Sequence, residues 1–185
     1  GSGNAATSLA KLLNMKVDMK VPEVKIVEFK NVSDILGGAE IRVVGLMLRV
    51  EGDISGGIMF ILGYEEARVL VNQLMGLDTS RVKDGFDKIE SSALLEIANI
   101  LASSYISALS TLTNLKITAS VPDMAIDMAG AILSVPAIEF GRVGDNVLFI
   151  QTIFLEGSTS VSGSFFLIPD LDSYADLLEA LGVDV

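Results

Sequence analysis

The side chains available for chemistry are carboxylates, amides and hydroxyls, because the 185 residues include no histidine and no cysteine. This inventory excludes a Ser-His-Asp triad, a cysteine nucleophile and zinc sites built from histidine and cysteine. One pair stands out: Glu96 and Asn99 lie three residues apart in a long helical pattern. Side chains at i and i+3 of a helix are neighbours, so this carboxylate and this amide are expected to project together.

The helix that must position this pair is predicted from Asp87 to about Thr113. With a period of 3.6 residues, one narrow strip is polar and the opposite, wider face is apolar. The strip holds Ser92, Glu96, Asn99, Ser103 and Ser110, and the apolar face holds Leu94, Ile97, Leu101, Tyr105, Ala108 and Leu112. We therefore expect the apolar face to be buried and the polar strip to point outward.

A glutamate and an asparagine on the polar face of a helix are ordinarily solvated surface. Two details favour a function for them. Asparagine is a poor helix former, so one in mid-helix calls for a reason. Small residues flank the strip, including Ala98, Ala102 and Ser103, and they leave room for a partner to approach.

The rest of the chain predicts strands and helices in a repeating order. Apolar spacing indicates a helix over 5–13, ending near Asn14, and a second helix over 64–75, ended by Gly76. Alternation predicts strands over 16–29, with a break at Pro22, and over 41–51 and 54–62, which a Gly-Asp turn joins as a hairpin.

Matching residues recur at fixed offsets along the chain. Asn14, Lys16 and Pro22 have counterparts 100 residues later at Asn114, Lys116 and Pro122; Ser55-Gly56, Leu70 and Leu74 have counterparts 107 residues later at Ser162-Gly163, Leu177 and Leu181. We predict a single domain over 1–185, made of two homologous halves of about 1–80 and 87–185. Its expected class is α/β (α+β): an internally duplicated pseudo-twofold domain whose continuous, mainly antiparallel sheet carries long helices.

Composition limits the partners. A net charge of −11 argues against nucleic acid and against anionic membrane surfaces. Every apolar run is much shorter than the roughly 18 residues of a membrane span, and no basic-then-apolar leader is present, so we expect a cytoplasmic protein without membrane insertion.

The spacing Ser92-x3-Glu96-x2-Asn99-x22-Pro122 resembles the signature of the CheC, CheX and FliY phosphatases. The flanking words over 96–105 (EIANILASSY) and 126–136 (IDMAGAILSVP) are most similar to CheC-type members, and 3–9 (GNAATSL) resembles their first helix. The resemblance runs essentially end to end. It implies a chemotaxis hydrolase of two-component signalling, which removes the aspartyl phosphate of phosphorylated CheY.

The resemblance also implies roles for residues. Glu96 and Asn99 would be catalytic, with Ser92 and Pro122 supporting the motif. Asn99 would position the attacking water, as a glutamine does in small GTPases, and Glu96 would pair with a CheY lysine. No cofactor is expected in this chain, because CheY supplies the Mg²⁺. CheD is an expected further partner, and a second Glu-x2-Asn site would lie upstream of Gly1.

Other interpretations stay open. One alternative is a non-catalytic flagellar rotor-switch module of the FliY or FliM type, which would bind CheY without hydrolysis. Residues 1–6 superficially match a dinucleotide-binding glycine pattern, but alternating strands follow where a βαβ unit is required. Residues 55–57 lack the Gly-Lys-Ser/Thr of a phosphate loop and are better explained as a strand entry or bulge.

Overall fold

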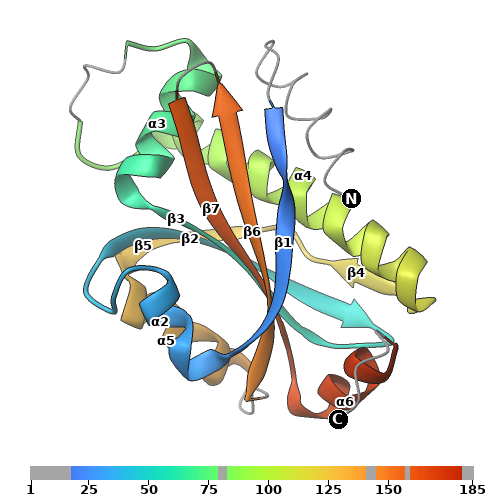
Figure 1. Ribbon diagram of the computed structural model, residues 1–185. Coiled ribbons are helices and arrows are strands. Elements are labelled where there is room, and N and C mark those ends of the chain that lie inside the picture. The colour runs from blue at the N-terminus through green and yellow to red at the C-terminus, as the bar shows by residue number, and fades with distance from the viewer. Residues whose placement is uncertain (1–17, 79–82, 141–144, 157–158, 181–185) are drawn as a thin grey trace.

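The computed structural model describes residues 18–78, 83–140, 145–156 and 159–180 (Figure 1). Its strands are β1 (Asp18–Glu28), β2 (Arg42–Gly52), β3 (Gly56–Gly63), β4 (Ile117–Ala119), β5 (Asp123–Met128), β6 (Asn146–Glu156) and β7 (Thr159–Pro169). Its helices are the short η1 (Phe29–Asn31) and α2 (Val32–Ile35), then α3 (Tyr64–Met75), α4 (Lys88–Thr113), α5 (Ala129–Phe140) and α6 (Leu171–Ala180). The helix predicted over 5–13 lies outside the described residues.

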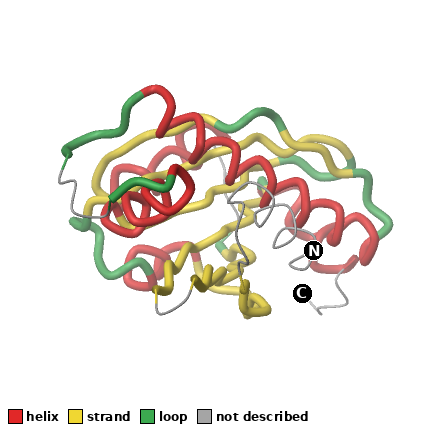
Figure 2. The backbone as a smooth tube through the Cα atoms, turned by 90° about the horizontal axis from the view of Figure 1, so that it is seen from above, coloured by secondary structure: helices red, strands yellow, loops and turns green. Residues whose placement is uncertain are grey.

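The seven strands form one sheet in the order β1-β6-β7-β3-β2-β4, with β5 also paired to β2. Every pairing is antiparallel. One face of the sheet packs with α3, α4 and α6, and the other with η1, α2 and α5. Figure 2 shows helices on both sides of the strands. The predicted class, a mixed α/β domain with a continuous antiparallel sheet, is confirmed.

The strand pairing recurs at fixed offsets: 100 and 107, which were read from the sequence, and 104, which the structure adds. At the centre of the sheet Met59 of β3 pairs with Phe166 of β7, the residue 107 positions later. Glu28 of β1 pairs with Asn146 of β6. The equivalent pair is Met128 of β5 with Arg42 of β2: Met128 lies 100 positions after Glu28, and Arg42 lies 104 positions before Asn146. The described strands are thus related by an approximate twofold. The division into two homologous halves stays a prediction that this register supports.

Both prolines of the repeat coincide with irregular pairing. The register of β1 against β6 shifts between Lys20 and Glu23, where Pro22 lies. Pro122 lies in the gap between β4 and β5, which pair with different parts of β2. Proline has no N–H to donate to a ladder, so each sequence can form a strand only with a break at this point.

The helix α5 and the short elements η1 and α2 were not expected from the sequence. The element α5 contains Pro136 and is apolar almost throughout, so it lacks the amphipathic pattern by which a helix is recognised. It packs closely on the sheet: a Cβ added to Gly45 of β2 would lie 2.7 Å from Cγ2 of Ile132. The glycine therefore makes room for the helix.

The long helix α4 is confirmed within one residue of its predicted bounds. By length and composition alone α4 is apolar enough to span a membrane, but Leu94, Ile97 and Leu101 are fully buried in the core. Figure 1 shows α4 lying along the sheet. The prediction for its last turn is wrong, because Leu112 is 74% exposed and Ala108 is only half-buried. The described elements cover the helix only as far as Leu109.

Candidate active site

Glu96 and Asn99 are both exposed on the outer face of α4. The two residues between them, Ile97 and Ala98, are fully buried. Three residues of helix correspond to a rise of about 4.5 Å, so the two side chains are neighbours on one surface. The structure thus presents this pair outward on a helix whose opposite face is anchored in the core.

A groove of about 770 Å³ lies beside Asn99, between α4 and β4. Its walls are rich in hydroxyl groups: Ser103, Ser107, Ser110 and Thr111 line it from α4, and Thr118 lines it from β4. Lys116 contributes the one charged side chain among the described residues of the lining. Glu96 is not among those residues, so Asn99 is the member of the pair that borders the groove.

The two supporting residues of the motif belong to different elements, Ser92 to α4 and Pro122 to the segment between β4 and β5. Ser92 is exposed, and its hydroxyl donates to the carbonyl of Lys88 at 2.8 Å, within the helix's own first turns. Pro122 is half-buried and follows Ser120, whose Oγ accepts from the Arg49 N–H at 2.9 Å. These contacts assign Ser92 a local bond in α4 and place Pro122 at a break in the strand edge beside it.

A capping box fixes the start of α4. The Asp87 carboxylate accepts from the N–H groups of Ile89 and Glu90, at 3.0 and 2.9 Å, and Glu90 Oε2 accepts from the Asp87 N–H at 2.7 Å. These bonds satisfy N–H groups that have no partner within the helix. The hydrogen bond from the Glu90 N–H is the main reason that the pKa of Asp87 is lowered.

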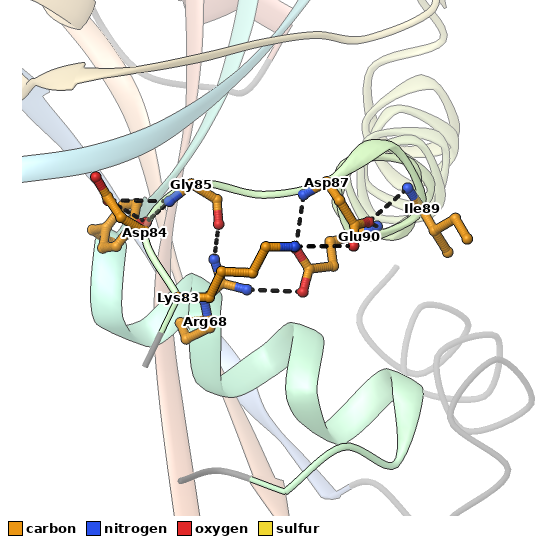
Figure 3. Close-up of polar contacts among 8 residues, drawn as sticks. Arg68, Lys83, Asp84, Gly85, Asp87, Ile89 and Glu90 are labelled. Carbon is orange, nitrogen blue, oxygen red and sulfur yellow. Dashed lines mark hydrogen bonds and ion pairs between the residues drawn. The ribbon is translucent and has the colours of Figure 1, made fainter. Parts of the chain in front are cut away.

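The other oxygen of Glu90 ties α4 to the neighbouring helix. Arg68 of α3 donates through Nη1 to Glu90 Oε1 at 3.0 Å, and both side chains are almost fully buried (Figure 3). Arg68 Nη2 also donates to the Gly85 carbonyl, and its guanidinium lies 4.0 Å from the centre of the Phe86 ring. One arginine therefore contacts the connector and the first turn of α4 together.

Four residues before Arg68 on the same helix, Tyr64 holds the same connector. Its hydroxyl donates to Asp84 at 3.0 Å and accepts from the Gly85 N–H at 2.6 Å. Arg42 of β2 donates to Asp84 Oδ1 at 2.8 Å, and this hydrogen bond is the main reason that the pKa of Asp84 is lowered. The connector into α4 is thus fastened to both α3 and β2.

A second buried polar contact lies further along α4. The Tyr105 hydroxyl is 2.9 Å from Oγ1 of Thr152 on β6, and the two residues are 4% and 0% exposed. Burial raises the pKa of Tyr105, so the phenol stays protonated at neutral pH. This contact joins the second half of α4 to β6 of the sheet.

Sequence reasoning missed Arg68, Tyr105 and Thr152 as polar contacts. A partial signal existed for Arg68, since a charged residue there interrupts the apolar face formed by Ala67, Leu70 and Val71. Asp87 followed three residues later by Glu90 is likewise a readable capping box. The partner of each side chain depends on how distant segments pack, which the sequence pattern does not specify.

Among the described residues, no group of three or more aspartate, glutamate, histidine or cysteine side chains could hold a metal ion. The arrangement on α4 offers instead an exposed amide, an exposed carboxylate and a hydroxyl-lined groove. An amide can both donate to and accept from a bound water, and a carboxylate can pair with a cation of a docked partner. The prediction that this chain carries no cofactor stays a prediction.

Comparison with known proteins gives three findings. A model of the CheC-like family matches residues 1–26 and 89–126, the second of which contains Glu96, Asn99 and Pro122. The CheY-P phosphatase CheC of Bacillus subtilis is 38% identical over 188 aligned residues, which cover 100% of this chain and 90% of that protein. The flagellar motor switch phosphatase FliY of B. subtilis is 27% identical over 120 residues, covering 65% of this chain and 31% of that protein.

Solved structures agree with the fold. The crystal structure of Thermotoga maritima FliY is similar to this chain with a TM-score of 0.72 and 22% identity, over 98% of this chain and 89% of that one. At this level of identity the likeness concerns the fold.

Proposed function

The chain belongs to the CheC-like family, and we propose from this premise that it is a CheY-P phosphatase, a hydrolase acting on the aspartyl phosphate of phosphorylated CheY. The similarity to the B. subtilis CheY-P phosphatase spans the whole chain. The observation that carries the proposal is the placement of Glu96 and Asn99, exposed side by side on a helix whose other face is buried.

We assign Asn99 the task of positioning the attacking water. Phosphoryl transfer needs an in-line nucleophile and stabilisation of charge around the transferred group, and little covalent chemistry from the protein. The Asn99 carboxamide can accept a hydrogen bond from the water through its oxygen and donate one to an oxygen beside it through its nitrogen. Its exposed position at the edge of the groove supports this role, because a docked surface can reach it.

We assign Glu96 the task of holding CheY in place. An exposed carboxylate is a poor general base, but it can form a charge-assisted hydrogen bond with a lysine of the partner. Glu96 is one turn before Asn99, so an ion pair there would fix the docked surface about 4.5 Å along the helix from the reacting groups. The Mg²⁺ of the reaction is assigned to CheY and not to this chain.

The remaining parts of the proposal rest on the family. We expect CheD as a second protein partner and the cytoplasm as the compartment. We also expect the second Glu-x2-Asn site upstream of Gly1. The family model matches two separate segments, 1–26 and 89–126, whose ends are 100 residues apart. This spacing equals one offset of the repeat and supports the proposed duplication.

A rotor-switch role is the second candidate, and the similarity to FliY favours it. In that role the chain would bind CheY in the flagellar motor switch. The match to CheC is closer in identity and covers most of both chains, so we place the phosphatase first.

The test is the decay of phosphorylated CheY in the presence of the 185-residue chain. Replacing Glu96 and Asn99 together by alanine should return the decay to its spontaneous rate, a loss of about 100-fold or more in acceleration. Asp176→Ala with Glu179→Ala, an exposed pair with the same i, i+3 spacing on α6 and outside the groove, is the matched control and should keep the acceleration within about twofold. Circular dichroism should show native helix content in both. Full acceleration by the double variant refutes the site.

A further inference from the structure

The helix α4 is held at two buried polar contacts on the side opposite to Glu96 and Asn99. One contact joins Glu90 to Arg68, and the other joins Tyr105 to Thr152. Glu90 and Tyr105 are fifteen residues apart, which corresponds to about 22 Å of helix. Asp87 and Gly85 reinforce the first contact through the capping box and the Arg68 bond to the Gly85 carbonyl (Figure 3).

The candidate catalytic pair lies midway between these contacts. Glu96 is six residues after Glu90, and Asn99 is six residues before Tyr105. With about 100° of rotation per residue, the mean direction of Glu96 and Asn99 is about 180° from that of Glu90 and Tyr105. Any rotation or sliding of α4 about these contacts is therefore passed to the pair directly.

Apolar packing alone specifies such a position weakly. The contacts of Leu94, Ile97 and Leu101 are non-directional, and cores tolerate changes of shape that conserve volume. Hydrogen bonds depend steeply on distance and angle, and buried polar groups are best attested as devices that fix register. Each of the two contacts also joins α4 to a different element, α3 in one case and β6 in the other.

We infer that Arg68, Glu90, Tyr105 and Thr152 are positioning residues of the phosphatase, which set the rotation and axial position of α4 so that Asn99 meets the attacking water. This inference rests on the proposed function. It predicts a loss of turnover without a loss of folding when both contacts are removed as matched pairs. A purely structural role predicts that activity follows stability.

Two paired variants remove the contacts without leaving a lone buried charge. Tyr105→Phe with Thr152→Val deletes both hydroxyls and keeps the shape of each side chain, which is close to neutral for stability. Arg68→Met with Glu90→Gln removes both charges, and the glutamine oxygen can still accept from the Asp87 N–H. The four-residue variant combines them.

The expected result is a split between turnover and binding. The four-residue variant should lower the maximal rate of CheY-P decay by about 10- to 100-fold, because a displacement of about 1 Å in a positioned group has effects of that size. The half-saturating CheY-P concentration should change much less. Hydrogen exchange of the α4 amides should become faster, while Tm stays within about 4 °C of the wild type.

Ile150→Val is the matched control. Ile150 is buried two residues before Thr152 on the same face of β6, and its truncation lowers stability without touching either polar contact. It should lower Tm by about 2–4 °C and leave the maximal rate unchanged. A control that loses rate as much as the four-residue variant overturns the inference.

An unchanged maximal rate in the four-residue variant also overturns the inference. If the wild-type chain does not accelerate CheY-P decay, the proposed function fails on its own, and hydrogen exchange then decides whether the two contacts hold α4. Unchanged protection of α4 in the four-residue variant overturns the holding role.

Discussion

The two groups of strands related by the approximate twofold pair in the same register, yet two of the polar residues that hold α4, Thr152 and Arg68, have apolar residues at the equivalent positions. Thr152 of β6 corresponds to Leu48 of β2, 104 residues earlier, and both are buried on the same face of the sheet. Arg68 of α3 corresponds to Ala175 of α6, 107 residues later, which is exposed. Tyr105 corresponds in sequence to Ala5.

This difference separates what builds the sheet from what specialises it. The strand frame needs alternating apolar residues and backbone pairing, which both halves supply. Buried polar groups cost desolvation, and both the Arg68–Glu90 ion pair and the Tyr105–Thr152 contact involve the helix that carries Glu96 and Asn99. Such a concentration of buried polar contacts at one helix is expected where exact placement matters more than stability.

The largest expected change in stability comes from removing one partner of the ion pair between Arg68 and Glu90. Arg68→Ala leaves the buried Glu90 carboxylate with the half-exposed Lys83 Nζ, 4.0 Å from its Oε2, as its remaining cation, and we expect a loss of about 3 kcal/mol in the free energy of unfolding, the low end for a broken buried pair. The counterpart Ala175→Arg places the same side chain on an exposed helix position and should change stability by less than about 0.5 kcal/mol. Urea unfolding measures both.

A small loss for Arg68→Ala, similar to that of Ala175→Arg, would mean that Glu90 is solvated in solution. Arg68 of α3 and Ala175 of α6 would then differ in residue type but not in their contribution to the free energy of unfolding. Tm measured with the Arg68→Met, Glu90→Gln pair distinguishes this case, since the pair should be far less harmful than the single alanine.

A second and smaller contrast lies in two equivalent glycines, Gly56 of β3 and Gly163 of β7. Gly56 has φ +146°, and a Cβ there would lie 2.2 Å from the Ile168 carbonyl oxygen, which is backbone and cannot move aside. At Gly163 the nearest atom, 2.5 Å away, belongs to the Phe60 ring. Alanine at either site should cost about 1–3 kcal/mol, with Gly56→Ala at the upper end.

Thermal unfolding of the two alanine variants checks this order. Equal losses, or a larger loss at Gly163, would show that the Phe60 ring is as fixed as the backbone beside Gly56. The packing around Gly56 and around Gly163 would then be equally intolerant of a Cβ.

Much of this arrangement could be predicted from the sequence, and the reasons for failure are specific. The 3.6-residue period places Glu96 and Asn99 outward and Leu94, Ile97 and Leu101 inward, and the structure agrees. The hairpin and the helix ended by Gly76, at φ +62°, follow from local turn chemistry. Periodicity alone assigned Leu112 to the buried face, because it cannot tell where the covering elements end.

The polar contacts of α4 could not be predicted in the same way. Arg68 and Glu90 are 22 residues apart, and Tyr105 and Thr152 are 47 apart, so their pairing depends on tertiary packing. The helix α5 escaped prediction for the opposite reason, since its almost uniformly apolar sequence has no period to read.

The smallest expected effect concerns the aspartates that precede α4 and α6. Asp170 accepts from the Ser173 N–H at 2.8 Å and from Ser55 Oγ at 2.5 Å. Burial alone would raise the pKa of Asp170, but the hydrogen bonds from Ser55 and Ser173 outweigh it and the pKa is lowered. The pKa of Asp87 is lowered as well, mainly by the hydrogen bond that its carboxylate accepts from the Glu90 N–H at the start of α4.

The sign of the pH effect follows from these shifts. A carboxylate whose pKa is lower in the folded state stabilises the fold above its unfolded pKa, near 3.8, and this contribution is lost as the pH falls through the lower folded value. Asp170→Ala should therefore cost about 0.5–1 kcal/mol at pH 7, the low end for a partly exposed cap, and less at acidic pH, once Asp170 is protonated in the folded protein. Asp170→Asn keeps an acceptor for the Ser173 N–H, so it should retain most of the cap with a flatter dependence on pH. Urea unfolding from pH 7 to pH 2 measures all three proteins, and a cost of Asp170→Ala that stays constant over this range would show that the Asp170 cap does not depend on its charge.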